Sequence, residues 1–229
     1  MAVTLPSPKA ILFDWDGTLI DNWGAILAAI NEALAAYDKP TWSRDEAMER
    51  ISASQRDSFP VLFGDDWKRA QDIFYAGFER HHLAVMRVLD GAEGLLAAGA
   101  SLPMGLVSNK NGDYLRKEVA HLGWNARFRS VVGATDAVAD KPDPAPVSMA
   151  LEPIGLEAGP HIWFVGDSGT DMATARATGC TAVLVQHEAA NPSPIPASLA
   201  PDLAVETLND LTAALAEHLK MRIAITAPN

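Results

Sequence analysis

Residues 11–19 read ILFDWDGTL, an apolar run that ends in two carboxylates, Asp14 and Asp16, and then in glycine and threonine. If residues 11–13 form a buried parallel strand, the carboxylates lie at its carboxyl end, where open α/β sheets bind ligands. Asp14 could then be a nucleophile, because carboxylates form aspartyl-phosphate intermediates, and Asp16 could protonate a leaving group. The alternative is a plain turn, since Asp-Gly is a common turn pair.

Short apolar runs recur along the chain and predict buried strands. They are residues 10–13, 103–107, 130–133, 162–165 and 182–185. Most of them are followed by polar or glycine-rich turns and then by helical patterns. This alternation is typical of a parallel sheet with helices on both faces, so the sequence predicts an α/β fold. An amphipathic pattern over residues 208–219 predicts a closing helix.

The chain between the first two predicted strands is unusually long, and residues 21–88 within it show helical patterns without a strand signal. Apolar residues recur there at three- and four-residue spacing, which predicts an amphipathic helix. They are Ala25, Ile26, Ala29, Ile30, Ala33 and Leu34. We interpret residues 21–88, called the insert below, as an all-helical cap on a core formed by residues 1–20 and 89–229.

Capping signals predict two further helices in the insert. Ser43 with Glu46 three residues later predicts a capping box at a helix N-terminus. That helix is expected to run to Ile51, and Asp65 or Asp66 is expected to open the next one.

Composition and charge exclude several classes of function. The 229 residues are 48% apolar and 21% charged, which is ordinary for a globular protein and enough for a sizeable core. The net charge is −11 and no run is rich in Lys or Arg, so we expect no nucleic-acid partner. No window approaches about 18 uninterrupted apolar residues and no signal peptide is recognisable, so we expect no membrane partner. The single Cys180 fits a reducing compartment, and we expect a cytoplasmic protein.

Two further segments place polar side chains near predicted strand ends. In residues 106–110 (LVSNK), Ser108 offers a hydroxyl, and the backbone N–H groups beyond it can face an anion. A plain helix cap is the alternative for Ser108. In residues 141–144 (KPDP), Lys141 stands before a proline-rich turn and could hold a phosphate or the nucleophilic carboxylate. The alternative for Lys141 is a solvated surface charge.

A last segment, residues 164–171 (FVGDSGTD), again has carboxylates after an apolar run. Asp167 and Asp171 would join the first two carboxylates in an oxygen-rich cluster, and Mg²⁺ suits such a site because it binds carboxylates, water and phosphate oxygens. For Asp171 the alternative is an acidic residue that complements a helix dipole. The predicted metal-binding set is Asp14, Asp16, Asp167 and Asp171.

In this order the motifs resemble those of the haloacid dehalogenase-like hydrolase superfamily, and the resemblance covers nearly the whole chain. The matching positions are residues 14–18 for DxDGT, Ser108 for the second motif, Lys141 for the third, and Gly166, Asp167 and Asp171 for GDxxxD. The resemblance implies a Rossmann-like core and identifies residues 21–88 with the family's helical C1 cap. Within the superfamily the chain looks like the branch of phosphoglycolate phosphatase and β-phosphoglucomutase.

The resemblance implies a Mg²⁺-dependent phosphatase that hydrolyses a small phosphomonoester through an aspartyl-phosphate intermediate. Asp14 would attack phosphorus, and Asp16 would protonate the leaving alkoxide and then activate water. Ser108 and Lys141 would hold the phosphoryl oxygens that are not transferred. The substrate contacts expected in the core are Thr18, Ser108, Asn109 and Lys141.

The same resemblance implies how the metal is held. Mg²⁺ would bind the Asp14 carboxylate, the Asp16 backbone carbonyl and Asp167. Asp171 would orient these ligands. Cations are needed because the nucleophile and the phosphate are both anions. The expected partner is a small phosphorylated metabolite, and the protein is expected to be a monomer or a homodimer.

Other activities of the superfamily are the alternatives. Haloacid dehalogenases lack the second aspartate, which stands here as Asp16. Phosphonoacetaldehyde hydrolases share a Trp after the nucleophile but carry Ala at the position of Asp16, and they need a cap lysine, for which Lys39 and Lys68 are available. Sugar-phosphate mutases carry a cap histidine where this chain has Ile26. A non-catalytic interaction protein would not need the retained carboxylates and Lys141.

The insert also contains candidate specificity residues. Residues 51–58 lie where related caps carry a specificity loop, and we predict that Arg56 contacts the substrate, with Gln55 as the second candidate. A solvated surface arginine is the alternative. His81 and His82 resemble a metal pair, but adjacent helical residues point about 100° apart, so we interpret them as surface or hinge residues.

Overall fold

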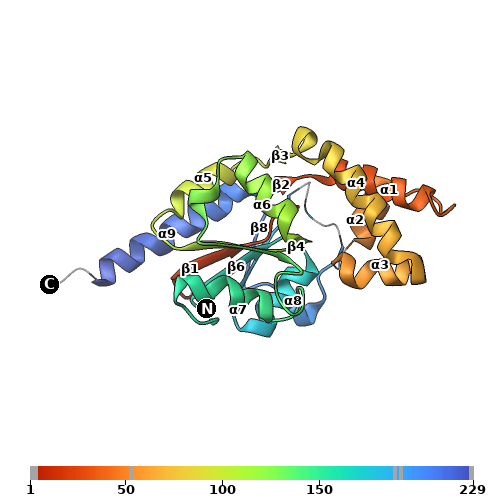
Figure 1. The fold of residues 1–229 in the computed structure, drawn as a ribbon. Coiled ribbons are helices and arrows are strands. Elements are labelled where there is room, and N and C mark those ends of the chain that lie inside the picture. The colour runs from red at the N-terminus through yellow and green to blue at the C-terminus, as the bar shows by residue number, and fades with distance from the viewer. Residues whose placement is uncertain (1–4, 52–53, 188–189, 191–192, 227–229) are drawn as a thin grey trace.

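The structure of the protein is a computed structural model that describes residues 5–51, 54–187, 190 and 193–226. Within these residues, six strands form a parallel sheet in the order β5-β4-β1-β6-β7-β8 (Figure 1). The strands are β1 (Ala10–Phe13), β4 (Met104–Asn111), β5 (Ser130–Ala134), β6 (Ile162–Gly166), β7 (Thr181–Val185) and β8 (Leu203–Val205). The predicted α/β fold is confirmed.

All the predicted strands are present. The sequence analysis missed β8 and two short strands, β2 (Ile20–Asp21) and β3 (Arg87–Val88), and β3 lies within the insert that was expected to be all-helical. β8 is three residues long, and its side chains are half-buried or exposed. It therefore lacks the continuous apolar run that marks a strand buried on both faces. Its place at the sheet edge, where it pairs with β7, explains why it needs no such run.

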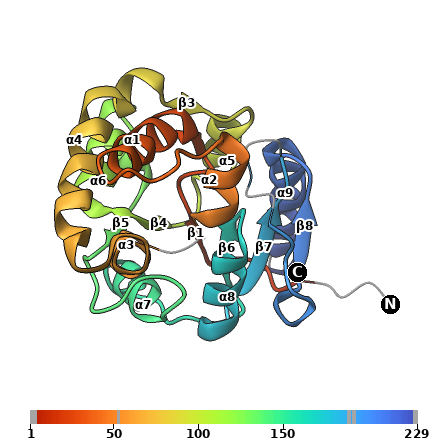
Figure 2. The same ribbon diagram turned by 90° about the vertical axis from the view of Figure 1, so that its right-hand side faces the viewer.

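The two faces of the sheet bury alternate residues of β1. Ile11 and Phe13 pack in one hydrophobic cluster with α5, α6 and α9, whereas Ala10 and Leu12 pack in another with α7 and α8 (Figure 2). These helices are α5 (Ala92–Ala98), α6 (Gly112–His121), α7 (Ala145–Leu151), α8 (Gly169–Thr178) and α9 (Leu208–Thr226). Because β1 lies between β4 and β6, the carboxyl ends of these three parallel strands are neighbours.

The described helices of the insert pack around a hydrophobic cluster of their own. They are α1 (Trp23–Ala35), α2 (Arg44–Arg50), α3 (Gln55–Phe63) and α4 (Trp67–Val85). The aromatic part of the cluster contains Phe59, Phe63, Phe74 and Phe78, whose neighbouring rings lie 5.1–5.8 Å apart between centroids. In Figure 1 the four helices lie to one side of the sheet.

The capping box predicted at Ser43 is present. Ser43 Oγ accepts a hydrogen bond from the Glu46 N–H, and the Glu46 carboxylate accepts one from the Ser43 N–H. The helix that it opens ends at Arg50, with Ile51 as its C-cap. The next predicted start is also confirmed, because α4 begins directly after Asp66.

The helix α3 differs from the expectation for residues 51–58. We expected a specificity loop there, but a helix begins at Gln55, while residues 52 and 53 lie outside the described part of the chain. Phe59 and Phe63 are four residues apart and therefore share one face of α3, which they bury in the insert cluster. Tertiary packing thus makes a helix from a segment with a weak local signal.

Two short strands connect the insert to the core. β2 (Ile20–Asp21) and β3 (Arg87–Val88) pair antiparallel, with Ile20 opposite Val88. The Asp21 carboxylate lies 2.6 Å from Arg87 Nη2 and 3.6 Å from Arg44 Nη2. Burial opposes its charge, but these arginines and the Trp23 N–H together hold the pKa of Asp21 below its usual value. The chain therefore enters and leaves the insert at one place.

Short 3₁₀ helices complete the described elements. They are η1 (Gly64–Asp66), η2 (Asn125–Arg127), η3 (Glu152–Ile154) and η4 (Ala197–Leu199). Among the described residues, no helix has the length and apolar character that a membrane span requires.

Candidate active site

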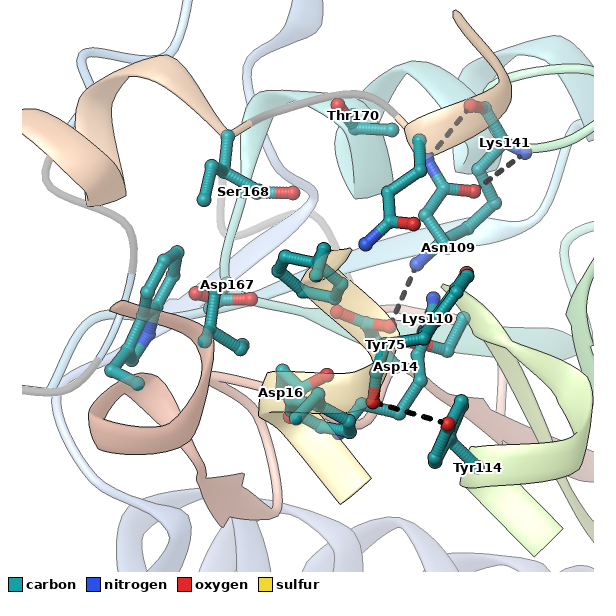
Figure 3. A pocket seen from close by; sticks show the side chains of 17 residues that line it. Asp14, Asp16, Tyr75, Asn109, Lys110, Tyr114, Lys141, Asp167, Ser168 and Thr170 are labelled. Atoms are coloured by element: carbon teal, nitrogen blue, oxygen red, sulfur yellow. Dashed lines mark hydrogen bonds and ion pairs between the residues drawn. The ribbon is translucent and has the colours of Figure 1, made fainter. Parts of the chain in front are cut away.

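A pocket of about 140 Å³ lies at the carboxyl ends of β1, β4 and β6, between the core and the insert (Figure 3). The parallel register brings together side chains that are more than a hundred residues apart in the sequence. The predicted site residues that line the pocket are Asp14, Asp16, Ser108, Asn109, Lys141 and Asp167. In Figure 3, Asp167 lies on one side of Asp14, and Lys110, Tyr75 and Tyr114 lie on the other.

Lys141 and two carboxylates form the first charged group, called the Lys141 cluster. Lys141 Nζ lies 2.8 Å from Asp14 Oδ1 and 2.6 Å from Asp171 Oδ1, and its side chain is only 3% exposed. Burial disfavours the ammonium, but the two carboxylates outweigh burial and raise the pKa of Lys141. Burial also raises the pKa of Asp14, an effect that Lys141 opposes. The ion pair therefore favours the ionised form of a buried carboxylate.

Asn109 and Asp171 fix the position of Lys141. The Asn109 side chain donates to the Lys141 carbonyl at 3.0 Å and accepts from the Lys141 N–H at 2.9 Å. One carboxylate oxygen of Asp171 accepts a hydrogen bond from Lys141 Nζ. The other accepts hydrogen bonds from Ser168 Oγ and from the backbone N–H groups of Asp167 and Ser168. Both Asp171 oxygens are thus engaged, so this buried residue braces the lysine and the turn between β6 and α8.

The carboxylates of Asp14, Asp167 and Asp171 form a group that could hold a metal ion. Each offers an oxygen within 4.8 Å of the others. Thr18 Oγ1 donates to Asp167 Oδ1 at 3.2 Å. At Gly17, where φ is +79°, a Cβ would lie 2.3 Å from Asp167 Oδ2, so glycine leaves the space that this carboxylate occupies. Hard oxygen ligands of this kind suit Mg²⁺.

Lys110 and two other carboxylates form a second charged group, called the Lys110 cluster. Lys110 Nζ lies 2.8 Å from Asp16 Oδ1 and 2.6 Å from Glu118 Oε2, and its side chain is 6% exposed. Burial raises the pKa of Asp16 to about 7, although Lys110 opposes this shift. The Asp16 carboxylate faces Lys110, and the group of carboxylates that could hold a metal consists of Asp14, Asp167 and Asp171. The expected metal contact of the Asp16 backbone carbonyl stays a prediction.

Glu118 connects the Lys110 cluster to the insert. It is fully buried on α6 and accepts hydrogen bonds from Trp15 Nε1 at 2.7 Å and Asn22 Nδ2 at 2.8 Å. His82 Nδ1, on α4 of the insert, lies 2.7 Å from Glu118 Oε1. Burial opposes the Glu118 charge, but Lys110 and the hydrogen bond with His82 outweigh it and lower the pKa of Glu118.

The sequence analysis missed Glu118 and misplaced His82. His82 is 1% exposed, so the surface alternative of its interpretation is wrong and the hinge alternative stays a prediction, whereas His81 is exposed. Glu118 shares the buried face of α6 with Leu115 and Val119. A carboxylate on an apolar helix face was therefore the available signal, but its partners lie too far along the chain to be identified from the sequence.

Two predicted substrate contacts do not line the pocket. Thr18 is fully buried behind it and binds Asp167. Arg56 is absent from the pocket lining, and its guanidinium donates to the Val138 carbonyl at 3.0 Å and lies 3.2 Å from Asp140 Oδ1. Gln55, the second candidate, does line the pocket.

The side of the pocket that the insert supplies is largely apolar. Its lining side chains are Trp23, Ile26, Ile51, Gln55, Phe74, Tyr75 and Phe78, and Tyr114 of α6 adjoins them. The Tyr75 and Tyr114 rings are stacked, with centroids 5.1 Å apart and planes 12° apart. Trp15 is instead a core residue, packed edge-on against Trp124. The pocket thus has a charged end in the core and an apolar end under the insert.

Comparisons with known proteins agree on one family. A family model described as haloacid dehalogenase-like hydrolase matches residues 11–185. The chain is 31% identical over 236 residues to the phosphoglycolate phosphatase of Escherichia coli strain K12, covering 90% of this chain and 92% of that protein. It is 28% identical over 210 residues to the N-acetylmuramic acid 6-phosphate phosphatase of Pseudomonas aeruginosa, covering 89% and 92%.

Solved structures share the fold. A haloacid dehalogenase-like family hydrolase from Streptococcus pneumoniae matches with a TM-score of 0.79 at 20% identity, covering 91% of this chain and 98% of that one. A HAD-superfamily hydrolase from Ehrlichia chaffeensis matches with a TM-score of 0.64 at 26% identity, covering 94% and 100%.

Proposed function

Because the chain belongs to the haloacid dehalogenase-like hydrolases, we propose that it hydrolyses a small phosphomonoester through an aspartyl-phosphate on Asp14. It is then a phosphoric monoester hydrolase that is phosphoglycolate phosphatase-like in the reaction it catalyses, the hydrolysis of a small phosphomonoester. The observation that carries the proposal is the presence in one pocket of two aspartates, each paired with its own buried lysine. The substrate class is a small phosphorylated metabolite of the cytoplasm.

In the first step a carboxylate oxygen of Asp14 attacks phosphorus, and the ester P–O bond breaks. Lys141 favours ionised Asp14, and together with Ser108 it holds phosphoryl oxygens that are not transferred. Asp16 gives its proton to the departing alkoxide. This role suits a carboxyl group whose pKa is about 7, because a general acid is most effective when its pKa lies near the pH at which the enzyme works.

In the second step a water molecule attacks phosphorus, and the bond between phosphorus and Asp14 breaks to release inorganic phosphate. Asp16, now ionised, takes a proton from this water. One residue can serve both steps because the alcohol leaves from the side on which the water arrives. The position of Asp16 in the pocket lining, fixed by Lys110, supports this assignment.

We propose Mg²⁺ as the metal, held by the carboxylates of Asp14 and Asp167 and by the backbone carbonyl of Asp16. The oxygen-rich group at the strand ends supports this choice. When bound, the ion would neutralise charge on the phosphoryl oxygens. Asp171 would act indirectly, because both of its oxygens already bind Lys141 and the turn after β6.

We further propose that residues 21–88 form a cap domain that closes over the substrate. Its separate hydrophobic cluster and its paired connecting strands, β2 and β3, support this division from the core. Closure would exclude water until the leaving group departs. The site is complete within one chain, which suits either a monomer or a homodimer.

The alternative chemistries have less support from the site. A phosphonoacetaldehyde hydrolase needs a cap lysine, but neither Lys39 nor Lys68 lines the pocket, and Lys68 lies over the Trp67 ring. A dehalogenase has no use for Asp16, which lines the pocket. A sugar-phosphate mutase would carry a histidine at Ile26, and this side chain lines the apolar end.

Hydrolysis of p-nitrophenyl phosphate tests the proposal. We expect activity that requires Mg²⁺, is lost with EDTA and returns when Mg²⁺ is added. Asp14→Asn should abolish turnover, whereas Asp72→Asn, an exposed aspartate of the insert, should not change it. Near-normal turnover by Asp14→Asn would refute the covalent mechanism, and activity that survives EDTA would refute the metal assignment.

A further inference from the structure

The apolar end of the pocket constrains the group that leaves with the ester oxygen. Asp14 and the lysine-bound carboxylates occupy the core end, so the leaving alcohol must extend toward the insert. There it meets Trp23, Ile26 and Phe74, and the stacked rings of Tyr75 and Tyr114. The polar groups that the described residues offer at this end include the Gln55 amide, the tyrosine hydroxyls and the Trp23 indole N–H, and these groups are uncharged.

No free cation faces this end among the described residues that line the pocket. The lysines of the lining are Lys110 and Lys141, and each is already bound to two carboxylates within 2.8 Å. Lys141 must also serve the transferred phosphate. A second anionic group on the substrate would therefore find no ammonium available to it.

The net charge of the lining points the same way. In the protonated form of Asp16 that the first step requires, the carboxylates of Asp14 and Asp167 face two lysines, so the lining is formally neutral before substrate binds. The charges of a bound divalent cation and of the phosphate dianion would then cancel. Nothing in this balance attracts a further negative charge.

Arg56 is a nearby cation that could pair with a carboxylate on the substrate, but in the structure it is paired with Asp140. Its guanidinium lies 3.2 Å from the Asp140 carboxylate, whose side chain is 1% exposed. It also donates to the Val138 carbonyl, so α3 is held against the loop that precedes Lys141. Moving Arg56 into the pocket would leave Asp140 buried without this ion pair.

We propose that the leaving group of the natural substrate is a small, uncharged alcohol with an apolar face, and not an alcohol that carries a carboxylate. The inference rests on the proposed phosphatase function and narrows its substrate class. Burying a carboxylate among apolar side chains without a partner is costly, whereas an apolar face gains from contact with the aromatic wall. The cavity of about 140 Å³ limits the size of the alcohol. Phosphoglycolate, which the name of the Escherichia coli relative gives as its substrate, carries such a carboxylate and is predicted to be a poor substrate here.

Two nearly isosteric esters test the charge alone. We would measure kcat/KM with Mg²⁺ for phosphoglycolate and for its amide, phosphoglycolamide. The amide should be preferred at least about tenfold, because its neutral group avoids the cost of an unpaired buried carboxylate. Equal or higher kcat/KM for phosphoglycolate would overturn the inference. Loss of activity on both esters and on p-nitrophenyl phosphate would instead refute the proposed function.

A variant with an added positive charge tests whether the leaving group lies beside Gln55 at the apolar end of the pocket. Gln55→Arg places a cation in the lining and should reduce the preference for the amide, or reverse it, by improving kcat/KM for phosphoglycolate. Gln71→Arg is the matched control, since Gln71 binds Gln55 but does not line the pocket, and it should keep the wild-type preference. An unchanged preference in a folded Gln55→Arg protein would overturn the inference.

Arg56→Ala distinguishes our proposal from the alternative that Arg56 leaves Asp140 and binds the carboxylate of the substrate. If Arg56 stays on Asp140, its loss should change kcat/KM for both esters by a common factor. A selective loss of phosphoglycolate hydrolysis would show that Arg56 moves to bind the carboxylate, and would overturn the proposal.

Discussion

The Lys141 cluster and the Lys110 cluster are alike in geometry and different in what they connect. In each, a lysine that is almost fully buried lies 2.8 Å from one pocket aspartate and 2.6 Å from a second carboxylate. The partners in the Lys141 cluster, Asp14 and Asp171, belong to the core. The Lys110 cluster continues through Glu118 to Asn22 and His82, at the start and the end of the insert.

This difference separates two tasks within one pocket. The proposed nucleophile, Asp14, is held by groups that do not depend on the insert. The proposed acid and base, Asp16, is held by a lysine whose other partner is bonded to the insert. We therefore expect a change in the position of the insert to affect proton transfer more than nucleophilic attack. The predictions below test this contrast.

The largest effect is expected for Lys141→Ala. Loss of this cation leaves Asp14 and Asp171 without their shared partner and removes a group that binds the phosphate. We expect kcat/KM on p-nitrophenyl phosphate to fall about 10²–10³-fold or more. Lys117→Ala, which removes an exposed lysine paired with Glu79, is the matched control and should be nearly neutral. A loss confined to thermal stability would mean that Lys141 is only structural.

Lys110→Met should have the next largest effect, and one that depends on the leaving group. Lys110 fixes the position of the Asp16 carboxyl group, and poor leaving groups need a correctly placed acid. We therefore expect kcat/KM for an alkyl phosphate to fall about 10–10²-fold, and that for p-nitrophenyl phosphate to fall less. Lys110 opposes the rise of the Asp16 pKa to about 7, so its loss should raise that pKa further. Asp16 would then stay protonated to higher pH, and the alkaline fall of kcat/KM should move upward. Equal losses on both substrates with no change in the pH profile would contradict this assignment.

The third prediction compares the stability of variants at two adjacent histidines, His82 and His81. His82→Ala removes the insert's hydrogen bond to buried Glu118 and should lower the free energy of unfolding by about 1–3 kcal/mol. His81→Ala alters an exposed side chain one residue away and should change it by less than about 0.5 kcal/mol. Urea unfolding of both variants checks the difference. If the two variants are equally stable, His82 does not connect the insert to the core as we describe.

The smallest effect is expected for Arg56→Ala. Its ion pair with buried Asp140 joins α3 to the core, but Arg56 does not line the pocket, so its loss should hardly affect the reacting groups. We expect kcat/KM on p-nitrophenyl phosphate to change by less than about threefold. A large loss on this substrate would show that Arg56 contributes directly to the reacting end of the pocket.

The parts of the fold that the sequence predicted are those with strong local signals. β1 was recognisable because all of its residues are apolar, and α2 because its capping box lies within four residues. β8 and α3 were missed because partners elsewhere in the chain stabilise them: β7 for the short edge strand, and the Phe74 region for the buried face of α3.

The same distinction applies to the site. Asp14, Ser108, Lys141 and Asp167 were expected there because each follows or precedes a strand or turn of recognisable pattern. Lys110 was visible in the second motif, but its role depends on Glu118, a single carboxylate on an otherwise apolar helix face. The position of Arg56 could not be predicted, because it depends on where α3 begins.

The antiparallel pair formed by β2 and β3 has a consequence for how such proteins diversify. Ile20 and Val88 are partners in that pair, so the two points at which the insert joins the core are already adjacent. A shorter, longer or unrelated segment could replace the residues between them without moving the sheet, because the entropy of closing a loop depends only weakly on its length. Natural recombination at this junction could therefore exchange the insert, whose side chains would contact the alcohol, and leave the core residues that would bind the phosphate unchanged.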